Sequence, residues 1–138
     1  MARKIAVEAI NKAYSVLSNT TLFNAVEGNF FKGKKPDDFI GECVVITSLP
    51  MSRDQLQVCR IMVNIHVPNL EIELNDKIDR SQANYPRIAI LSKIVDDTFI
   101  EFDEGDISFR IEDDHVMENE GFDEHYNNYR IVFRNVNI

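Results

Sequence analysis

The sequence IMVNIHVP, residues Ile61–Pro68, gives the clearest indication of secondary structure in the chain. The odd-numbered residues from 59 to 67 are all apolar, whereas the even-numbered ones include Arg60, Asn64 and His66. Because side chains alternate between the two faces of a strand, this pattern predicts a β-strand with one apolar and one mixed face. Pro68 lacks a backbone N–H and fits the end of such a strand.

A histidine inside an apolar run can be a catalytic base, a metal ligand or an ordinary strand residue. Parity assigns His66 to the mixed face beside Asn64, so we interpret it as a strand histidine that faces solvent or a neighbouring subunit. We therefore expect a His66→Ala substitution to leave folding nearly intact.

The neighbouring segments predict a second strand that pairs with this one. The segment Glu42–Leu49, ECVVITSL, is apolar at odd and even positions, which is typical of an inner strand. The turn sequence LPMSRD separates it from the strand above, so the two should form a hairpin. Residues 69–85 fit either a strand extension or a docked loop.

Two amphipathic helices are predicted. In residues 3–17 an apolar residue recurs every fourth position, at Ile5, Ala9, Ala13 and Leu17. In residues 86–97 the apolar spacing is three, four and four, starting from Ile88, and Pro86 suits the first helical position. Asp96 and Asp97 oppose the helix dipole, so we expect the second helix to stop near them.

The C-terminal part predicts more strands. Thr98–Phe102 and Ile107–Ile111 alternate on either side of the turn DEGD, and Tyr129–Phe133 alternates again. The whole is predicted to be one α+β domain over residues 1–138. We expect a mainly antiparallel sheet of about four or five strands, with both helices packed on one face.

Charge is distributed unevenly. The 138 residues carry a net charge of −8, and residues 96–138 alone hold 13 acidic and 3 basic side chains. This balance argues against sequence-specific nucleic-acid binding, and no apolar run is long enough to span a membrane. The uneven charge permits head-to-tail contacts between copies of the chain. The interface residues that we predict are Lys32, Lys34, Lys35, Asn64, His66, Asp103, Glu104 and Asp106.

Catalytic and cofactor motifs are not evident. The chain has no GxSxG, and GNFFKGKK departs from the phosphate-loop pattern because Lys34 is followed by Lys35. Cys43 and Cys59 lie in apolar contexts and are interpreted as buried free thiols in a reducing compartment. We therefore predict a protein without enzymatic activity or a cofactor.

One acidic stretch, residues 112–125, combines seven carboxylates with two histidines. Such groups can bind a divalent cation, but their spacing matches neither a twelve-residue calcium loop nor HExxH. A solvated loop between two strands is the favoured interpretation. The candidate ligands, should a metal bind, are Asp113, Asp114, His115, Glu118, Glu120 and His125.

Taken together, two segments resemble a known family. VEGNFFKGKKPDDFIGECVVITSLP, followed by QLQVCRIMVNIHVPN, looks like the small tail-completion, or tail-terminator-like, proteins of long-tailed bacteriophages and prophages, in particular those of gut Bacteroidetes. The features that carry the resemblance are Gly28, Phe30, Lys32, Lys35, Pro36, Val44–Ile46 and Val63–Pro68. Two departures are Lys35, where an arginine often precedes the proline, and the acidic stretch 112–125.

The resemblance implies a structural role without catalysis. Members of the family form rings, typically hexamers, that cap the tail tube and join it to the neck. It implies a self-associating protein with tail-tube and neck partners, located in the host cytoplasm during assembly and then in the virion. We predict that the basic loop 32–35 is mobile before assembly. A small binding module of mobile-element origin remains an alternative, as does a divalent-metal-binding protein acting through residues 112–125.

Overall fold

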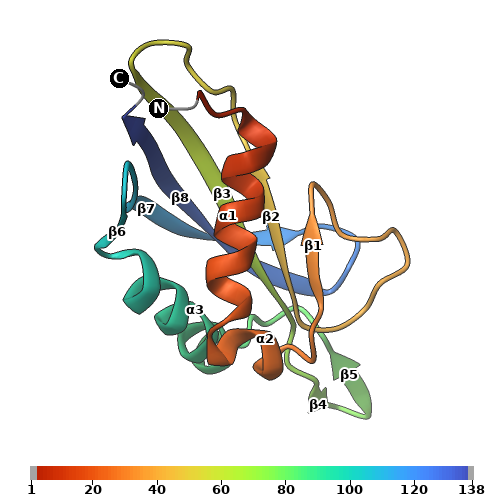
Figure 1. Ribbon diagram of the computed structural model, residues 1–138. Helices are drawn as coiled ribbons and strands as arrows, with labels where there is room; N and C mark the ends of the chain where they lie inside the picture. Colours follow the sequence, from red (N-terminus) through yellow and green to blue (C-terminus); the bar gives the residue numbers. More distant parts are fainter. Residues whose placement is uncertain (1–2, 137–138) are drawn as a thin grey trace.

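A computed structural model describes residues 3–136, which form a curved sheet with helices on one face (Figure 1). The helices are α1 (Ala6–Ser18), α2 (Thr21–Ala25) and α3 (Tyr85–Phe99). The strands are β1 (Phe30–Lys32), β2 (Cys43–Ser48), β3 (Leu56–Pro68), β4 (Ile72–Leu74), β5 (Lys77–Asp79), β6 (Phe102–Glu104), β7 (Ile107–Asn119) and β8 (Glu124–Val136). The predicted α+β class is confirmed.

Within residues 3–136 the main sheet has six strands in the order β1-β2-β3-β8-β7-β6. All neighbouring pairs are antiparallel except β1 and β2, which are parallel. The predicted hairpin of β2 and β3 is present, with Val44 opposite Ile65. The expected count of four or five strands was too low, because β1 is a three-residue strand whose alternation is too brief to detect.

The core lies between this sheet and the helices. Ile61, Val63 and Ile65 of β3 are fully buried on the helix side, as the parity of the sequence predicted. α1 contributes Ala9 and Leu17 to the same core. Each fully buried Val, Leu or Ile side chain stabilises the fold by about 1.5–3 kcal/mol relative to an exposed one.

The second helix runs past its predicted end. Asp96 and Asp97 do not stop α3, which continues to Phe99. Phe99 is fully buried and packs against Phe109, with ring centroids 4.9 Å apart, so its burial outweighs the weak dipole effect. As a consequence the predicted strand 98–102 is wrong, and β6 begins at Phe102.

The acidic stretch is not a loop. β7 continues through it to Asn119, and residues 120–123 form the turn into β8. Here β7 is the outer strand, because β6 pairs only with its first three residues. Most side chains of residues 112–118 are therefore exposed, and a strand in that position does not need the apolar alternation used to recognise strands.

A small hairpin, here called the arm (residues 70–80), projects from the body next to the end of β3 (Figure 1). It contains β4 and β5, which pair only with each other. Asn75 and Asp76, the two turn residues, both have positive φ, 51° and 64°. That conformation is the tight type I′ turn of two-residue hairpins, which Asn and Asp tolerate better than most residues.

Candidate interaction surfaces

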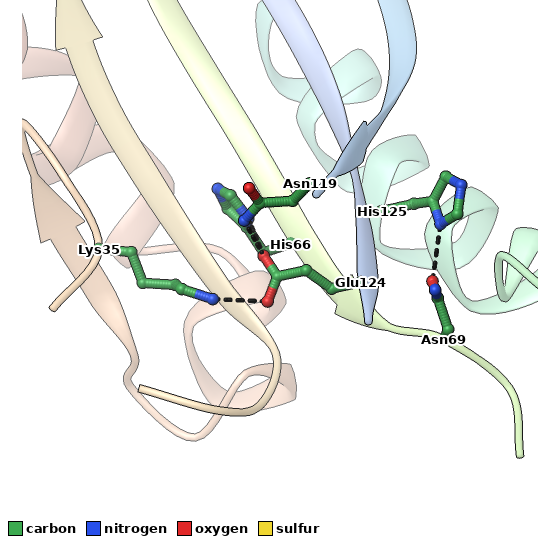
Figure 2. A network of polar contacts seen from close by, with 6 residues as sticks. All are labelled: Lys35, His66, Asn69, Asn119, Glu124 and His125. Carbon is green, nitrogen blue, oxygen red and sulfur yellow. Dashed lines mark hydrogen bonds and ion pairs between the residues drawn. The ribbon is translucent and has the colours of Figure 1, made fainter. Parts of the chain in front are cut away.

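A buried polar network lies where β3 ends and β8 begins (Figure 2). The carboxylate of Glu124 accepts hydrogen bonds from Lys35 Nζ at 2.5 Å, His66 Nδ1 at 2.5 Å and Asn119 Nδ2 at 2.9 Å. Glu124 is only 2% exposed. The network joins three segments that are distant in the sequence: the loop after β1, the end of β3, and the ends of β7 and β8 at the turn between them.

The three donors explain how a charged carboxylate is tolerated in this position. Burial alone would raise the pKa of Glu124, but the hydrogen bonds from His66, Lys35 and Asn119 outweigh it and lower the pKa to about 2. The neighbouring thiol behaves differently: burial raises the pKa of Cys43 to about 12. Cys43 and Cys59 are both buried and free, as predicted.

His66 corrects one prediction. It is a strand histidine, but it is 7% exposed rather than solvent-facing. Its ring stacks on the ring of Tyr126, with centroids 4.8 Å apart, and forms a hydrogen bond with the carboxylate of Glu124. At this end of β3 the ring contacts Glu124 and Tyr126 of β8, and Lys35 from the loop after β1 binds the same carboxylate. Alternation within β3 cannot reveal these contacts.

Lys35 also differs from the expected free loop cation. Its side chain is 8% exposed, it forms an ion pair with Glu124, and its Nζ lies 4.7 Å from the ring centroid of Phe122. Lys32 donates to Asn11 at 2.7 Å, and Lys34 pairs with Asp37 at the surface. The loop is thus held at Lys35, whereas Lys32, Gly33 and Lys34 are exposed.

The acidic residues predicted to contact other copies lie at the β6–β7 turn. Nη2 of Arg110 donates to both carboxylate oxygens of Asp103, at 3.0 and 3.1 Å, and Glu104 pairs with Lys12 of α1 at 2.5 Å. Asp106 is exposed in the turn. Because β1 and β6 are the outermost strands, the basic loop and the acidic turn border opposite edges of the sheet.

The face of the sheet opposite the helices carries paired charges. Arg60 donates to Glu112 at 3.2 and 3.3 Å, and this contact lowers the pKa of Glu112. Arg130 lies 3.7 Å from Glu112 and 3.8 Å from Asp113. Asn64, another predicted interface residue, is half-buried here and accepts from Asn128 at 2.5 Å. These exposed pairs contribute little stability individually.

The structure separates the candidate metal ligands. Asp113 and His115 are on the face opposite the helices, whereas Asp114 and Glu118 alternate onto the other face of β7. Glu120 is in the turn, and His125 bonds Asn69 Oδ1 through Nδ1 at 2.7 Å. Among residues 3–136 no group of three or more His, Cys, Asp or Glu side chains could hold a metal ion. The predicted candidates therefore do not converge on one site.

Two features escaped the sequence analysis. Glu124 and Asn119 were counted among ordinary loop residues, and nothing local distinguishes them from their exposed neighbours. The arm carried a signal that was readable: Leu70-Glu-Ile-Glu-Leu74 alternates strictly between apolar and acidic residues.

Comparison with known proteins finds the same fold in a solved structure but no match in sequence. No family model matches the chain, and no curated protein matches its sequence. A chain in the solved structure "Virion of native gene transfer agent (GTA) particle" matches with a TM-score of 0.63 and 13% identity, over 94% of each chain. None of the helices in the described part is both long and apolar enough to cross a membrane. At this identity the similarity shows a shared fold over nearly the whole length of both chains.

Proposed function

We propose that this protein is a non-catalytic structural component of a phage-like particle, with a role like that of tail-completion or tail-terminator proteins. In that role it forms a ring that caps the tail tube and joins it to the neck. The observation that carries the proposal is the fold shared, over 94% of each chain, with a chain of a gene transfer agent virion. The resemblance of the segments around Gly28–Pro36 and Val63–Pro68 to that protein family supports the same role independently.

The surfaces of the chain are compatible with assembly into a ring. A basic loop with exposed Lys34 and an acidic turn with exposed Asp106 border opposite edges of one sheet. Contacts between unlike surfaces repeat from copy to copy and give a ring when the rotation closes. On the face of the sheet opposite the helices, Arg60, Arg110 and Arg130 are paired with acidic side chains, which favours protein rather than DNA partners for that face.

The test is made on particles. Particles released from cells that carry the gene are purified and analysed by mass spectrometry, and a strain lacking the gene is compared by electron microscopy. We expect the protein in the particles at a fixed low copy number, and separate heads and tails when the gene is deleted. Intact, joined particles from the deletion strain that lack the protein would refute the proposal.

The alternative is a small binding module of mobile-element origin, which would have the same fold and a soluble partner. The exposed apolar arm is compatible with it, since the arm offers a surface to a partner of either kind. The particle experiment separates the two, because a soluble module is absent from purified particles and its loss leaves them joined.

A further inference from the structure

A groove of about 410 Å³ lies between α3 and the outer half of β7, and we call it the α3 groove. Tyr85, Ala89 and Asp96 of α3 line one side, and Asp114 and Val116 of β7 line the other. Tyr85 is 62% exposed, so its ring offers an open aromatic surface at the groove. The α3 groove thus combines apolar walls with two carboxylates, and none of its residues belongs to the buried polar network described above.

The two carboxylates of the α3 groove have no counter-ion. In the part of the chain that the structure describes, no basic side chain forms an ion pair with Asp96 or Asp114. Lys93, which also lines the groove, forms its ion pair with Asp97 at 3.2 Å. Burial raises the pKa of Tyr129 in the groove, and the charges of Asp114 and Asp96 raise it further. The groove is therefore negative and attracts a cation.

A buried amide in the same groove indicates which chemistry the cation needs. Asn127 of β8 lines the groove and is 3% exposed, and its Oδ1 is buried and accepts no hydrogen bond from residues 3–136. Its Nδ2 donates to Ser92 Oγ at 3.0 Å and to Asp114 Oδ2 at 3.3 Å. Exchanging the amide oxygen and nitrogen would set Oδ1 against the Asp114 carboxylate, which fixes the orientation of the amide. A buried acceptor without a donor is unfavourable, and a donor that enters the groove relieves it.

A guanidinium group fits these requirements better than other cations. It carries several N–H donors in one plane, so it can bind two neighbouring acceptors at once, and it stacks on aromatic rings such as that of Tyr85. The ammonium of lysine is a compact point charge and lacks both properties. A bare metal ion would leave the apolar walls uncovered, whereas the stem of an arginine packs along apolar surface.

The exposure of the walls favours a side chain that projects from another protein. Tyr85, Ala89, Lys93 and Asp114 all line the groove and are all exposed, so the groove is open to solvent. Sites for small molecules are usually more enclosed and bury most of the ligand surface. Exposed side chains such as Lys93 and Asp114 also change rotamer rapidly, which opens a way to the buried amide.

We propose that the α3 groove binds an arginine side chain of a partner protein. The guanidinium donates to Asn127 Oδ1 and to the carboxylate of Asp114, and the stem lies along Ala89 and Val116. This inference goes beyond the proposed function, because it requires neither a ring nor a particle.

The first test is a titration of isotope-labelled protein, followed by NMR, with N-acetyl-arginine amide, which presents the side chain as a protein does. N-acetyl-citrulline amide, which is uncharged and has nearly the same shape, is the control ligand. We expect the arginine amide to bind roughly tenfold more tightly, since hydrogen bonds between charged groups are the stronger ones. It should also shift the side-chain NH₂ signals of Asn127. Equal affinities for the two ligands, or no shift at Asn127, would overturn the proposal.

Two pairs of matched variants locate the site. Asp114→Asn should weaken binding of the arginine amide roughly tenfold, whereas Asp113→Asn, which removes the same charge from the opposite face of β7, should weaken it by less than about twofold. Ala89→Arg supplies a guanidinium from the groove itself and should block the ligand. Ile90→Arg, at the next residue of α3, lies outside the groove and should not. All four positions are exposed, so the variants should fold. Equal effects within either pair contradict the site.

Other ligands separate the competing sources of a cation. N-acetyl-lysine amide tests charge alone, free arginine represents a metabolite, and calcium chloride represents a metal ion. The proposal fails if the lysine amide binds as tightly as the arginine amide, or if millimolar calcium displaces the arginine amide. It also fails if free arginine binds more than about tenfold tighter than its blocked amide.

These results are independent of the particle experiment. A protein that is present in particles but does not bind the arginine amide keeps its virion role and loses this site. Specific binding by a protein absent from particles keeps the site and refutes the virion role.

Discussion

The end of β3 and the arm that follows it are adjacent in sequence and in space, and both mix apolar with ionisable residues. At the end of β3, His66 is covered and joined to Glu124, and the carboxylate in turn to Lys35, 89 residues away in sequence. In the arm, Leu74 and Ile78 remain more than half exposed, and the only strand partner is the arm itself.

This difference shows what alternation can and cannot report. Alternation identifies a strand and its apolar face, and it did so for β3. It does not reveal whether other segments bury a residue of the polar face, as Glu124 and Tyr126 do for His66, or whether an apolar residue stays exposed, as Leu74 of the arm does. The predictions below test how strongly the first region is held and how loosely the second.

The largest effect is expected for Glu124→Ala. Removing the carboxylate leaves Lys35 buried without its counter-ion, and loss of one partner of a buried pair costs about 3–5 kcal/mol. The free energy of unfolding, measured by urea denaturation at neutral pH, should fall by that amount. Glu118→Ala on the exposed part of β7 is the control and should change it by less than about 0.5 kcal/mol. Similar effects in both variants would mean that the network does not anchor the fold.

Acid should remove most of the same contribution. Because the folded state lowers the pKa of Glu124 to about 2, from an ordinary value near 4.3, the folded state binds this proton more weakly than the unfolded state. The resulting stability, about 3 kcal/mol, is fully present above the ordinary pKa and is lost as pH falls toward 2. The difference in unfolding free energy between the wild type and Glu124→Gln should therefore shrink from pH 5 to about pH 2. A constant difference would contradict the lowered pKa.

The parts of the fold that were predictable rest on local patterns. The apolar positions of β3, α1 and α3 follow from spacing, and each of these elements is where the sequence indicated. The end of α3 was not predictable from Asp96 and Asp97, since the burial of Phe99 depends on Phe109 in another element. The outer half of β7 was missed for a related reason: a strand at the edge of a sheet with exposed side chains has no apolar face to display.

The candidate interaction surfaces were also predictable only in part. The basic loop and the acidic turn border opposite edges of the sheet, because β1 and β6 stand at opposite ends of the strand order, but their contacts with other copies stay a prediction. The burial of Lys35 and His66 could not be predicted from the sequence. Both side chains bind Glu124, and Glu124 is buried only because three distant segments meet around it. Their exposure could be judged only once those segments were placed together.

A smaller loss is expected for His66→Ala. The substitution leaves Glu124 short of one donor and removes the stacking on Tyr126, which together cost about 1–3 kcal/mol. His115→Ala, exposed on β7, is the matched control and should stay within about 0.5 kcal/mol. Denaturation of both variants decides between the buried network and the solvent-facing histidine that the sequence suggested, since a neutral His66→Ala would favour the latter.

The smallest effect is expected in the arm itself. Leu74→Ser changes a side chain that is 54% exposed and absent from the core, so the unfolding free energy of the dilute, monomeric protein should change by less than about 0.5 kcal/mol. Amide hydrogen exchange should agree, with the arm exchanging fast and the centre of β3 exchanging slowest, because protection follows burial and sheet pairing. If Leu74→Ser costs more than about 1 kcal/mol in the monomer, the arm packs on its own body and Leu74 is not a free surface.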